Sequence, residues 1–144
     1  MPPKKSLQQL LEIARTRVDE VARSLGASCT REQEELSKLR LLLHYREEYV
    51  VRFGEASRAG LKRGAWTNYY EFMQKLDSAI GQQNELLDRH RGEVERLRAA
   101  WHAASGKLRS FATLDSRRKQ AEHALEQRRE QKEQDELALR RPRG

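Results

Sequence analysis

Proline, cysteine and long apolar runs are scarce in this sequence, and each scarcity excludes a class of protein. No proline interrupts residues 4–141, which removes the commonest helix breaker from almost the whole chain. The one cysteine, Cys29, cannot form an intrachain disulfide and fits a reducing cytoplasm. No segment is long and apolar enough to span a bilayer, and the N-terminal residues lack the apolar core of a signal peptide. We therefore expect a cytoplasmic protein without direct membrane insertion.

Apolar residues are also too few for a broad globular core. They make up 37% of the 144 residues, whereas 35% are charged, and the mean hydropathy is −0.96. Burial of so few side chains cannot offset the conformational entropy lost on folding into a globule. Leu, Ala, Glu, Gln, Lys and Arg dominate instead, and all are good helix formers. The composition thus favours long helices that bury a narrow seam over a disordered chain.

In each half of the chain, apolar residues recur at alternating spacings of three and four, the heptad pattern of helices that wrap around each other. In the first half, the expected seam contains Leu7, Leu11, Ala14, Val18, Val21, Leu25, Cys29, Leu36, Leu39, Leu43, Val50 and Phe53. In the second half, it contains Met73, Leu76, Ile80, Leu87, Val94, Leu97, Trp101, Ala104, Leu108 and Phe111. Between the halves, three glycines in GEASRAGLKRGA predict a bend.

We therefore predict an all-α fold: a long antiparallel two-stranded coiled-coil hairpin that forms a single domain, 1–144. The first helix is expected over about residues 5–55, the bend over about 56–65 and the second helix over about 66–138, with Asn68 as a candidate N-cap. A charged tail, 115–144, is expected to overhang the first helix in part. Alone it should fray, unless it becomes ordered inside a partner.

The segment 26–30 is the one irregularity expected within the first helix. Gly26 weakens a helix, and the heptad slips between Leu25 and Cys29. This pattern favours a stutter within a continuous helix, and a true break that would give three helices is the alternative.

Seven of the nine aromatic residues lie between positions 45 and 72, around the expected bend. Some of them follow helical spacing one residue before seam positions, which turns them about 100° from the seam. This offset stripe comprises Leu42, Tyr45, Tyr49, Tyr69, Phe72 and Ala79, with Leu76 between stripe and seam. Phe53, Trp66 and Tyr70 are expected to close the tip of the hairpin. Rings on a rigid helix are typical interface anchors, so the stripe favours a partner-binding surface over tip packing.

The chemistry of an enzyme is missing from the sequence. Its four histidines are scattered at spacings that do not suit a metal, and the Gly-Lys at 106–107 lacks the rest of a phosphate-binding loop. A thin helical rod offers no pocket that could shift the pKa of a catalytic group. We therefore predict no catalytic residue, no metal and no cofactor.

The net charge of +7 and the pI near 9.9 make nucleic acid the rival partner. Acidic residues are interleaved with the basic ones, however, and only 116–119 and 140–144 are locally basic. No stacking platform or zipper-linked basic region is present. We therefore expect no nucleic-acid binding.

Several strings resemble one known family over nearly the whole chain. LLHYREEY (42–49), the glycine-containing bend and WTNYYEFMQKLDSAI (66–80) are similar to the bacterial flagellar export protein family FliJ. So are RVDEVARSLG (17–26) and QKEQDELALRR (131–141). The aromatic-rich bend carries most of the resemblance, because heptad repeats match one another by chance. Two residues, Lys38 and Gln83, depart from the Gln and His expected in the enterobacterial form.

The resemblance implies a coiled coil similar to that of the rotary ATP synthase gamma subunit, acting in the cytoplasmic part of the flagellar type III export apparatus. It implies binding to the hexameric export ATPase through the end that carries both termini, to the linker of the export-gate membrane protein through a flank near the bend, and to export chaperones. The protein would then be cytoplasmic and peripherally associated with the inner membrane at the base of the flagellum. By position, the gate-binding surface comprises Leu42, Tyr45, Tyr49, Phe72, Leu76 and Ala79, with Tyr69 extending the stripe.

A charged rod with few apolar residues can also lie in the channel of a hexamer without locking to one subunit. The candidate ATPase contacts are Arg15, Asp19, Arg23, Arg117 and Arg118. The alternatives are the equivalent stalk of a virulence type III secretion system and, behind it, a basic nucleic-acid-binding coiled coil. Because hairpin seams can also form between chains, a dimer is a further possibility.

Overall fold

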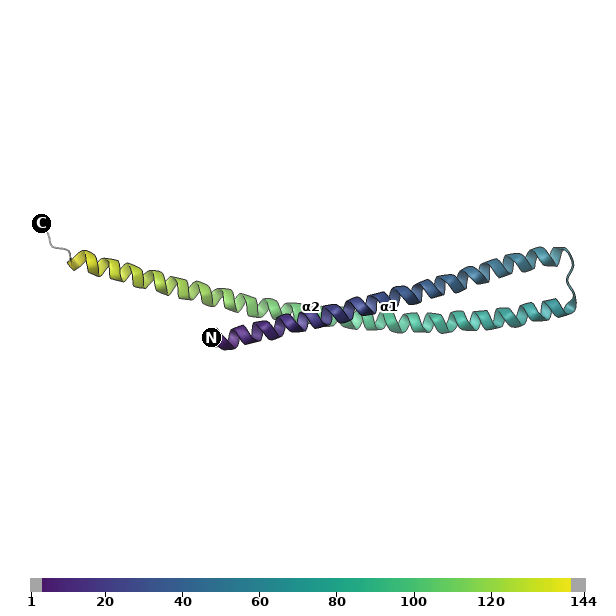
Figure 1. Cartoon of the computed structure of the whole chain (residues 1–144), viewed down its shortest axis with the longest axis horizontal. Helices are drawn as coiled ribbons and strands as arrows, with labels where there is room; N and C mark the ends of the chain where they lie inside the picture. Colours follow the sequence, from purple (N-terminus) through teal and green to yellow (C-terminus); the bar gives the residue numbers. More distant parts are fainter. Residues whose placement is uncertain (1–3, 141–144) are drawn as a thin grey trace. The chain divides into compact units, whose positions relative to one another are not determined.

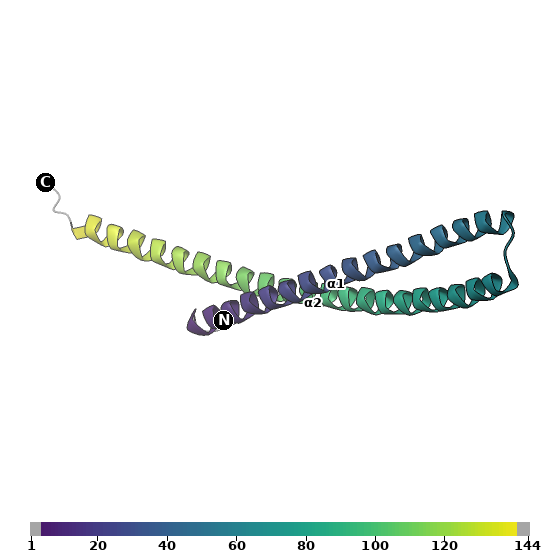
Figure 2. The same ribbon diagram turned by 45° about the vertical axis from the view of Figure 1, so that its right-hand side comes forward.

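The structure, a computed structural model that describes residues 4–140, contains two α-helices joined by a short bend (Figure 1). Helix α1 spans Lys4–Arg58 and α2 spans Arg63–Arg140. Near the bend, Phe53 contacts Trp66, and farther from it Glu32 pairs with Arg91, so the two helices run antiparallel. Both views show the two helices running back from the bend beside each other (Figures 1 and 2). The predicted all-α antiparallel hairpin is confirmed.

The bend occupies residues 59–62, between Arg58 and Arg63. The amide of Gly60 donates to the carbonyl of Ser57 at 3.2 Å, and its φ of +92° lies in the left-handed region that favours glycine. Gly60 therefore ends α1. The expected N-cap at Asn68 is wrong, because α2 already begins at Arg63 and Asn68 lies inside it.

Contacts divide the chain into two compact units, which are described separately. One unit is Val21–Trp101 and contains the bend. The other combines Met1–Glu20 with His102–Gly144, of which residues 4–20 and 102–140 are described. Below they are called the bend unit and the terminal unit.

In the bend unit, the inward-facing residues keep a strict alternation of three and four along both helices, as in a heptad repeat. On α1 they are Val21, Leu25, Ser28, Glu32, Glu35, Leu39, Leu42, Arg46, Tyr49 and Phe53, all buried or half-buried. On α2 they are Tyr69, Met73, Leu76, Ile80, Gln83, Leu87, His90, Val94, Leu97 and Trp101, again all buried or half-buried.

This seam corrects the predicted one on α1. The prediction placed Cys29, Leu36, Leu43 and Val50 in the seam, each of which follows a true seam position by one residue. Leu43 is 46% exposed and Val50 40%, whereas Ser28 is 2% exposed and Glu35 8%. The helix continues through residues 26–30 without a break, and the heptad continues there without the expected stutter.

Polar partners on α2 accompany three of the polar residues in this seam, whereas the buried Ser28 hydroxyl has no hydrogen-bond partner within residues 4–140. Glu35 accepts a hydrogen bond from Gln83, Glu32 pairs with Arg91 at 3.7 Å, and Arg46 Nε lies 2.6 Å from Asp77. A buried polar group is tolerated when its hydrogen-bonding capacity is met. The seam is therefore specified by pairs of residues on two helices rather than by apolar residues on one.

In the terminal unit, the seam is apolar near the start of α1 and becomes polar on α2. Leu7 and Leu11 are 1% and 2% exposed. On α2 the inward positions are Ala104, Leu108, Phe111, Asp115 and Arg118. Every residue from 119 to 140 is exposed. The expected tail that begins at 115 is therefore corrected: α2 stays packed through Arg118, and its exposed part starts after that residue.

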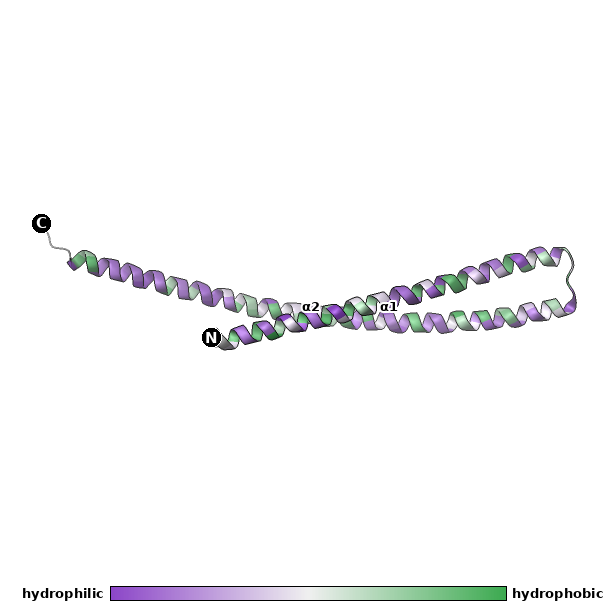
Figure 3. Cartoon of the chain, in the orientation of Figure 1, coloured by the Kyte–Doolittle hydropathy of each residue, from purple (hydrophilic) through white to green (hydrophobic). Residues whose placement is uncertain are grey.

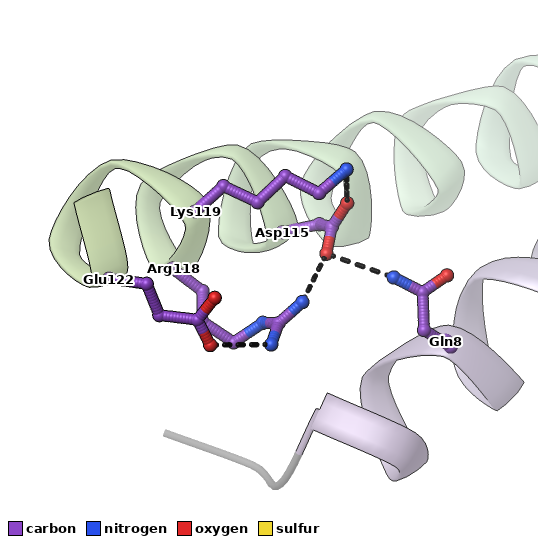
Figure 4. Close-up of polar contacts among 5 residues, drawn as sticks. All are labelled: Gln8, Asp115, Arg118, Lys119 and Glu122. Atoms are coloured by element: carbon purple, nitrogen blue, oxygen red, sulfur yellow. Dashed lines mark hydrogen bonds and ion pairs between the residues drawn. The ribbon is translucent and has the colours of Figure 1, made fainter. Parts of the chain in front are cut away.

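A small network closes this packed end (Figure 4). Asp115 accepts a hydrogen bond from Gln8 of α1 at 3.2 Å and pairs with Arg118 at 3.1 Å and with Lys119 at 3.2 Å. Arg118 also reaches Glu122 at 3.1 Å. The two cations hold the pKa of Asp115 below its ordinary value of 3.8, the Arg118 hydrogen bond contributing most. Asp115 therefore remains ionised and joins both helices of the terminal unit.

The helix of α2 extends to Arg140, so the charged segment is helical over its described length. Figure 3 shows it as a mostly hydrophilic stretch, in contrast to the mixed colours of both helices toward the bend. Residues 141–144 of the expected tail lie outside the described residues.

Candidate functional site

The rings near the bend form one contact network between α1 and α2. Phe53 stacks on Tyr69 with ring centroids 3.6 Å apart, and Trp66 meets Phe53 edge-on at 4.7 Å. Tyr49 lies 5.7 Å from Tyr69 and 4.3 Å from Phe72. Such ring pairs stabilise a packed helix end beyond the area they bury. The expected closure of the tip by Phe53 and Trp66 is confirmed.

The network also corrects the geometry of the offset stripe. Tyr49 and Tyr69 were expected to turn away from the seam, but both are half-buried between the helices. Leu42 also occupies a seam position, and Leu76 is only 8% exposed. Leu42 and Tyr49 differ from the expectation because the predicted seam on α1 is one residue too late at these positions, whereas Tyr69 lies one turn before Met73 in the α2 seam.

The remaining stripe residues do face outward on one side of the hairpin. Tyr45 is 52% exposed and Phe72 is 44% exposed, while Ala79 is half-buried. Phe72 contacts Tyr49, which lies one helical turn from Tyr45. We call this surface the Tyr45 flank: Tyr45, Phe72 and Ala79, with the accessible edges of Leu42 and Tyr49. It presents two large rings, held by rigid helices, beside the hairpin tip.

The Tyr45 flank continues away from the bend as a shallow groove. Its lining residues are Leu42, Ala79, Gln82, Gln83, Glu85, Leu86 and Arg89. Apolar side chains from both helices thus lie beside two amides, one carboxylate and one arginine. Apolar and polar groups lie together in this way in protein-binding surfaces.

Lys38 and Gln83, the two departures from the expected pattern, contact the same carboxylate. Gln83 Nε2 lies 2.5 Å from Glu35 Oε2 and 2.9 Å from the Glu35 backbone carbonyl oxygen. Lys38 Nζ lies 3.1 Å from Glu35 Oε1. The Gln83 hydrogen bond, followed by that of Lys38, holds the pKa of Glu35 below its ordinary value of 4.5. Gln83, which lines the groove, is therefore hydrogen-bonded to Glu35 in the seam. Together with Lys38, these two residues form a polar layer of the seam.

This layer predicts a pH-dependent contribution to stability. Because the pKa of Glu35 is lowered in the folded state, ionised Glu35 stabilises the fold above pH 4.5, and this contribution is lost as pH falls through the folded-state pKa. We expect Glu35→Gln to lower the melting temperature at pH 7, and the difference from wild type to be smaller at pH 3 than at pH 7. Thermal unfolding followed by circular dichroism measures both values.

Glu34→Gln is the matched control for this experiment. Glu34 directly precedes Glu35, is exposed and has no hydrogen bond or ion pair among those described. The melting temperature of the Glu34→Gln variant should therefore match that of the wild type at both pH values. Other carboxylates titrate in the wild type and in both variants and cancel in the comparison. A gap for Glu35→Gln that stayed constant with pH would contradict the role given to its charge.

The structure reveals a second exposed apolar surface that the sequence analysis assigned to the seam. Leu43 and Val50 each follow a seam residue by one position, so they lie across the seam from Tyr45. Tyr70 of α2, expected at the closed tip, is 60% exposed. The spacing of seven between Leu43 and Val50 was visible in the sequence, but it could not be told from the spacing of the seam.

The candidate ATPase contacts divide between accessible and buried residues. In the terminal unit, Arg15, Asp19 and Arg117 are exposed, and Arg23 is exposed in the bend unit. Arg118 is only 6% exposed and is engaged by Asp115 and Glu122 (Figure 4). Arg118 thus has a structural position that makes it a poor surface contact. The exposed helical segment 119–140 presents many more charges.

Within residues 4–140, no helix is long and apolar enough to cross a membrane. The same part of the chain contains no group of three or more His, Cys, Asp or Glu side chains that could hold a metal ion.

The fold and its surfaces define a class of protein: a coiled-coil hairpin that presents an aromatic flank beside its bend and a charged helical end. Comparison of the sequence with known proteins identifies a family within this class. The family model described as "Flagellar FliJ protein" matches residues 3–144. The flagellar FliJ proteins of Escherichia coli K12 and Salmonella typhi are each 30% identical over 135 residues, covering 94% of this chain and 92% of theirs. The chain belongs to the flagellar FliJ protein family.

Proposed function

We propose that this protein is a component of the flagellar type III protein export apparatus, and that it acts as a stalk between the hexameric export ATPase and the export gate. The Tyr45 flank would bind the linker of the gate membrane protein, and the charged helical end would bind the ATPase. In this role the protein works by binding rather than by catalysis. Such a stalk would be cytoplasmic and held at the inner membrane through its partners.

The observation that carries the proposal is the exposure of Tyr45 and Phe72 on one side of a rigid hairpin. An exposed ring is in contact with water on one face, and burying it against a partner releases that surface. Both residues are more than two-fifths exposed and flank the half-buried Leu42 and Tyr49. The helices also fix the rings before binding, which lowers the entropy lost on association. A linker peptide with apolar side chains fits this surface.

The charged end of α2 supports the ATPase half of the proposal. Residues 126–136 read EQRREQKEQDE and contain no apolar side chain, and all are exposed on a helix. A helix that is polar on every side has no preferred apolar face. It can therefore occupy a channel lined by several equivalent subunits without fixing its rotation to one of them. This is the property that a central stalk requires.

Delivery of export chaperones is included in the proposal as a third role, supported by family membership rather than by a mapped surface. The same membership supports the flagellar system over the virulence secretion system, which a similar hairpin could serve.

A bridging experiment tests the stalk directly. The cytoplasmic segment of the gate protein is immobilised, and the export ATPase is applied with and without this chain. We expect the ATPase to be retained several times more strongly when the chain is present, because the two partners bind opposite parts of it. Equal retention without the chain, or no retention with it, would overturn the proposed link.

A further inference from the structure

A row of apolar residues follows the outside of α1 across the seam from the Tyr45 flank. Leu36, Leu43 and Val50 are spaced by seven residues, so they lie on one stripe. Leu36 is half-buried, Leu43 is 46% exposed and Val50 is 40% exposed. Tyr70, the corresponding residue of α2 near the bend, is 60% exposed. We call this surface the Leu43 flank.

An isolated two-stranded coiled coil does not need this stripe. Positions beside the seam are usually charged in such coiled coils, since they remain in contact with water. A helix that carries apolar residues at one flanking position in successive heptads, in addition to its seam, is typical of a bundle, where it packs on more than one neighbour. The Leu43 flank therefore indicates a further helix in the assembled protein.

We propose that this further helix is α1 of a second copy of the chain, packed antiparallel about a twofold axis at Leu43. A twofold interface must be complementary to itself, with each residue matched by its counterpart across the axis. Leu36 and Val50 lie at equal distances in sequence before and after Leu43. In the antiparallel arrangement, Leu43 meets Leu43, and Leu36 of one copy meets Val50 of the other.

The charges beside the stripe have the symmetry that this arrangement needs. Arg40 and Glu47 are both exposed and lie on the same side of the stripe, one turn before and one turn after Leu43. An antiparallel pair places Arg40 of each copy next to Glu47 of the other, and so forms two ion pairs. A parallel pair would place this flank on opposite sides of the interface in the two copies, so these ion pairs would not form. Neither residue takes part in an ion pair or side-chain hydrogen bond described within the hairpin, so both charges are available.

The dimer leaves the Tyr45 flank open. Tyr45 precedes the seam residue Arg46, whereas Leu43 follows the seam residue Leu42, so the two flanks lie on opposite sides of the seam. The inference goes beyond the proposed function and does not depend on it. A variant that lacks the Tyr45 and Phe72 rings should still form the dimer. The dimer and the gate-binding role of the Tyr45 flank can therefore be tested separately.

Sedimentation over a range of concentrations tests the dimer, and charge reversal tests its arrangement. For the full chain, we expect the average mass to rise from 16.9 kDa toward twice that value. Arg40→Glu and Glu47→Arg should each weaken dimerisation by about tenfold, since each replaces two attractions by two repulsions. The double variant should recover to within about twofold of wild type. A chain that stays monomeric, or a double variant that does not recover, overturns the proposal.

Cysteine crosslinking locates the twofold axis independently. In a Cys29→Ser background, Leu43→Cys places two thiols against each other at the axis and should give a disulfide-linked dimer under mild oxidation. Val51→Cys is the matched control, because Val51 is 54% exposed but lies on the outer face of α1. Circular dichroism checks that both variants remain helical. Equal crosslinking of the two variants would rule out the proposed axis.

Discussion

Replacing Tyr45 and Phe72 together with alanine is expected to weaken binding to the cytoplasmic segment of the gate protein by at least about thirtyfold, since each buried aromatic anchor contributes more than about 1 kcal/mol. The hairpin should still fold. Tyr45 and Phe72 are 52% and 44% exposed, so their truncation removes little buried area. Phe72 does contact Tyr49 at 4.3 Å, and a modest fall in melting temperature is expected from that lost contact. Isothermal titration calorimetry measures affinity, and circular dichroism measures helix content.

The matched control removes comparable side chains from other faces. Val51→Ala with Tyr70→Ala deletes one aliphatic residue and one ring that are 54% and 60% exposed, and neither lies on the Tyr45 flank. This control should bind the gate segment as wild type does. If the Tyr45 and Phe72 double variant bound equally well, the flank would not be the gate-binding surface.

Leu76 shows why the choice of residue matters in such an experiment. The sequence places it in the seam and also at the edge of the stripe, and the structure buries it in the seam, where it is 8% exposed. Leu76→Ala would create a cavity and lower stability by about 2–5 kcal/mol. Any loss of binding by that variant would follow from weakened folding as well as from a lost contact. The two exposed rings avoid this ambiguity.

The hairpin could be predicted because its determinants are local. The absence of proline from residues 4–141 and the abundance of helix formers specify helix, and the glycines near position 60 specify where it stops. Phe53 and Trp66 then had to meet, because a short bend between two long helices leaves them opposite each other. The structure places their ring centroids 4.7 Å apart.

The register of the seam could not be predicted on α1, because it depends on the other helix. Apolar content alone favoured Leu36 over the polar seam residue Glu35 that precedes it. The structure instead buries Glu35 against Gln83 and aligns Arg46 with Asp77. A pattern read along one helix cannot include partners that lie some 30 to 50 residues away on the other. The same error placed Leu42 and Tyr49 outside the seam and hid the Leu43 flank.

The end of the packed region was misplaced for a related reason. Asp115 and Arg118 are charged, so the sequence indicated a solvated tail that began at 115. Their opposite charges pair at 3.1 Å, and Gln8 of α1 donates to Asp115 at 3.2 Å. Burial of a charged pair is tolerated when hydrogen bonds satisfy it. Charge by itself therefore does not mark the boundary between the packed and exposed parts of α2.

Ending the chain after Glu122 is expected to weaken binding to the export ATPase by about tenfold or more, because the charged helix supplies the electrostatic contacts of the proposed stalk end. The cut keeps Glu122, which bonds to Arg118, and so preserves the network of the terminal unit (Figure 4). All of residues 123–140 are exposed, so their removal should leave the melting temperature close to wild type. Gate binding should also be unchanged. Co-sedimentation with the ATPase hexamer measures the loss.

A second variant separates the charge of this segment from its exact sequence. Shuffling residues 126–136 keeps their composition and helix-forming character while changing the order of EQRREQKEQDE. A stalk that lies in the channel without locking to one subunit needs a polar helix of the right length, so the shuffled chain should bind almost as wild type does. If it bound as weakly as the shortened chain, the ATPase would be reading specific side chains in this segment. If the shortened chain bound as well as wild type, the ATPase contact would lie outside residues 123–144 altogether.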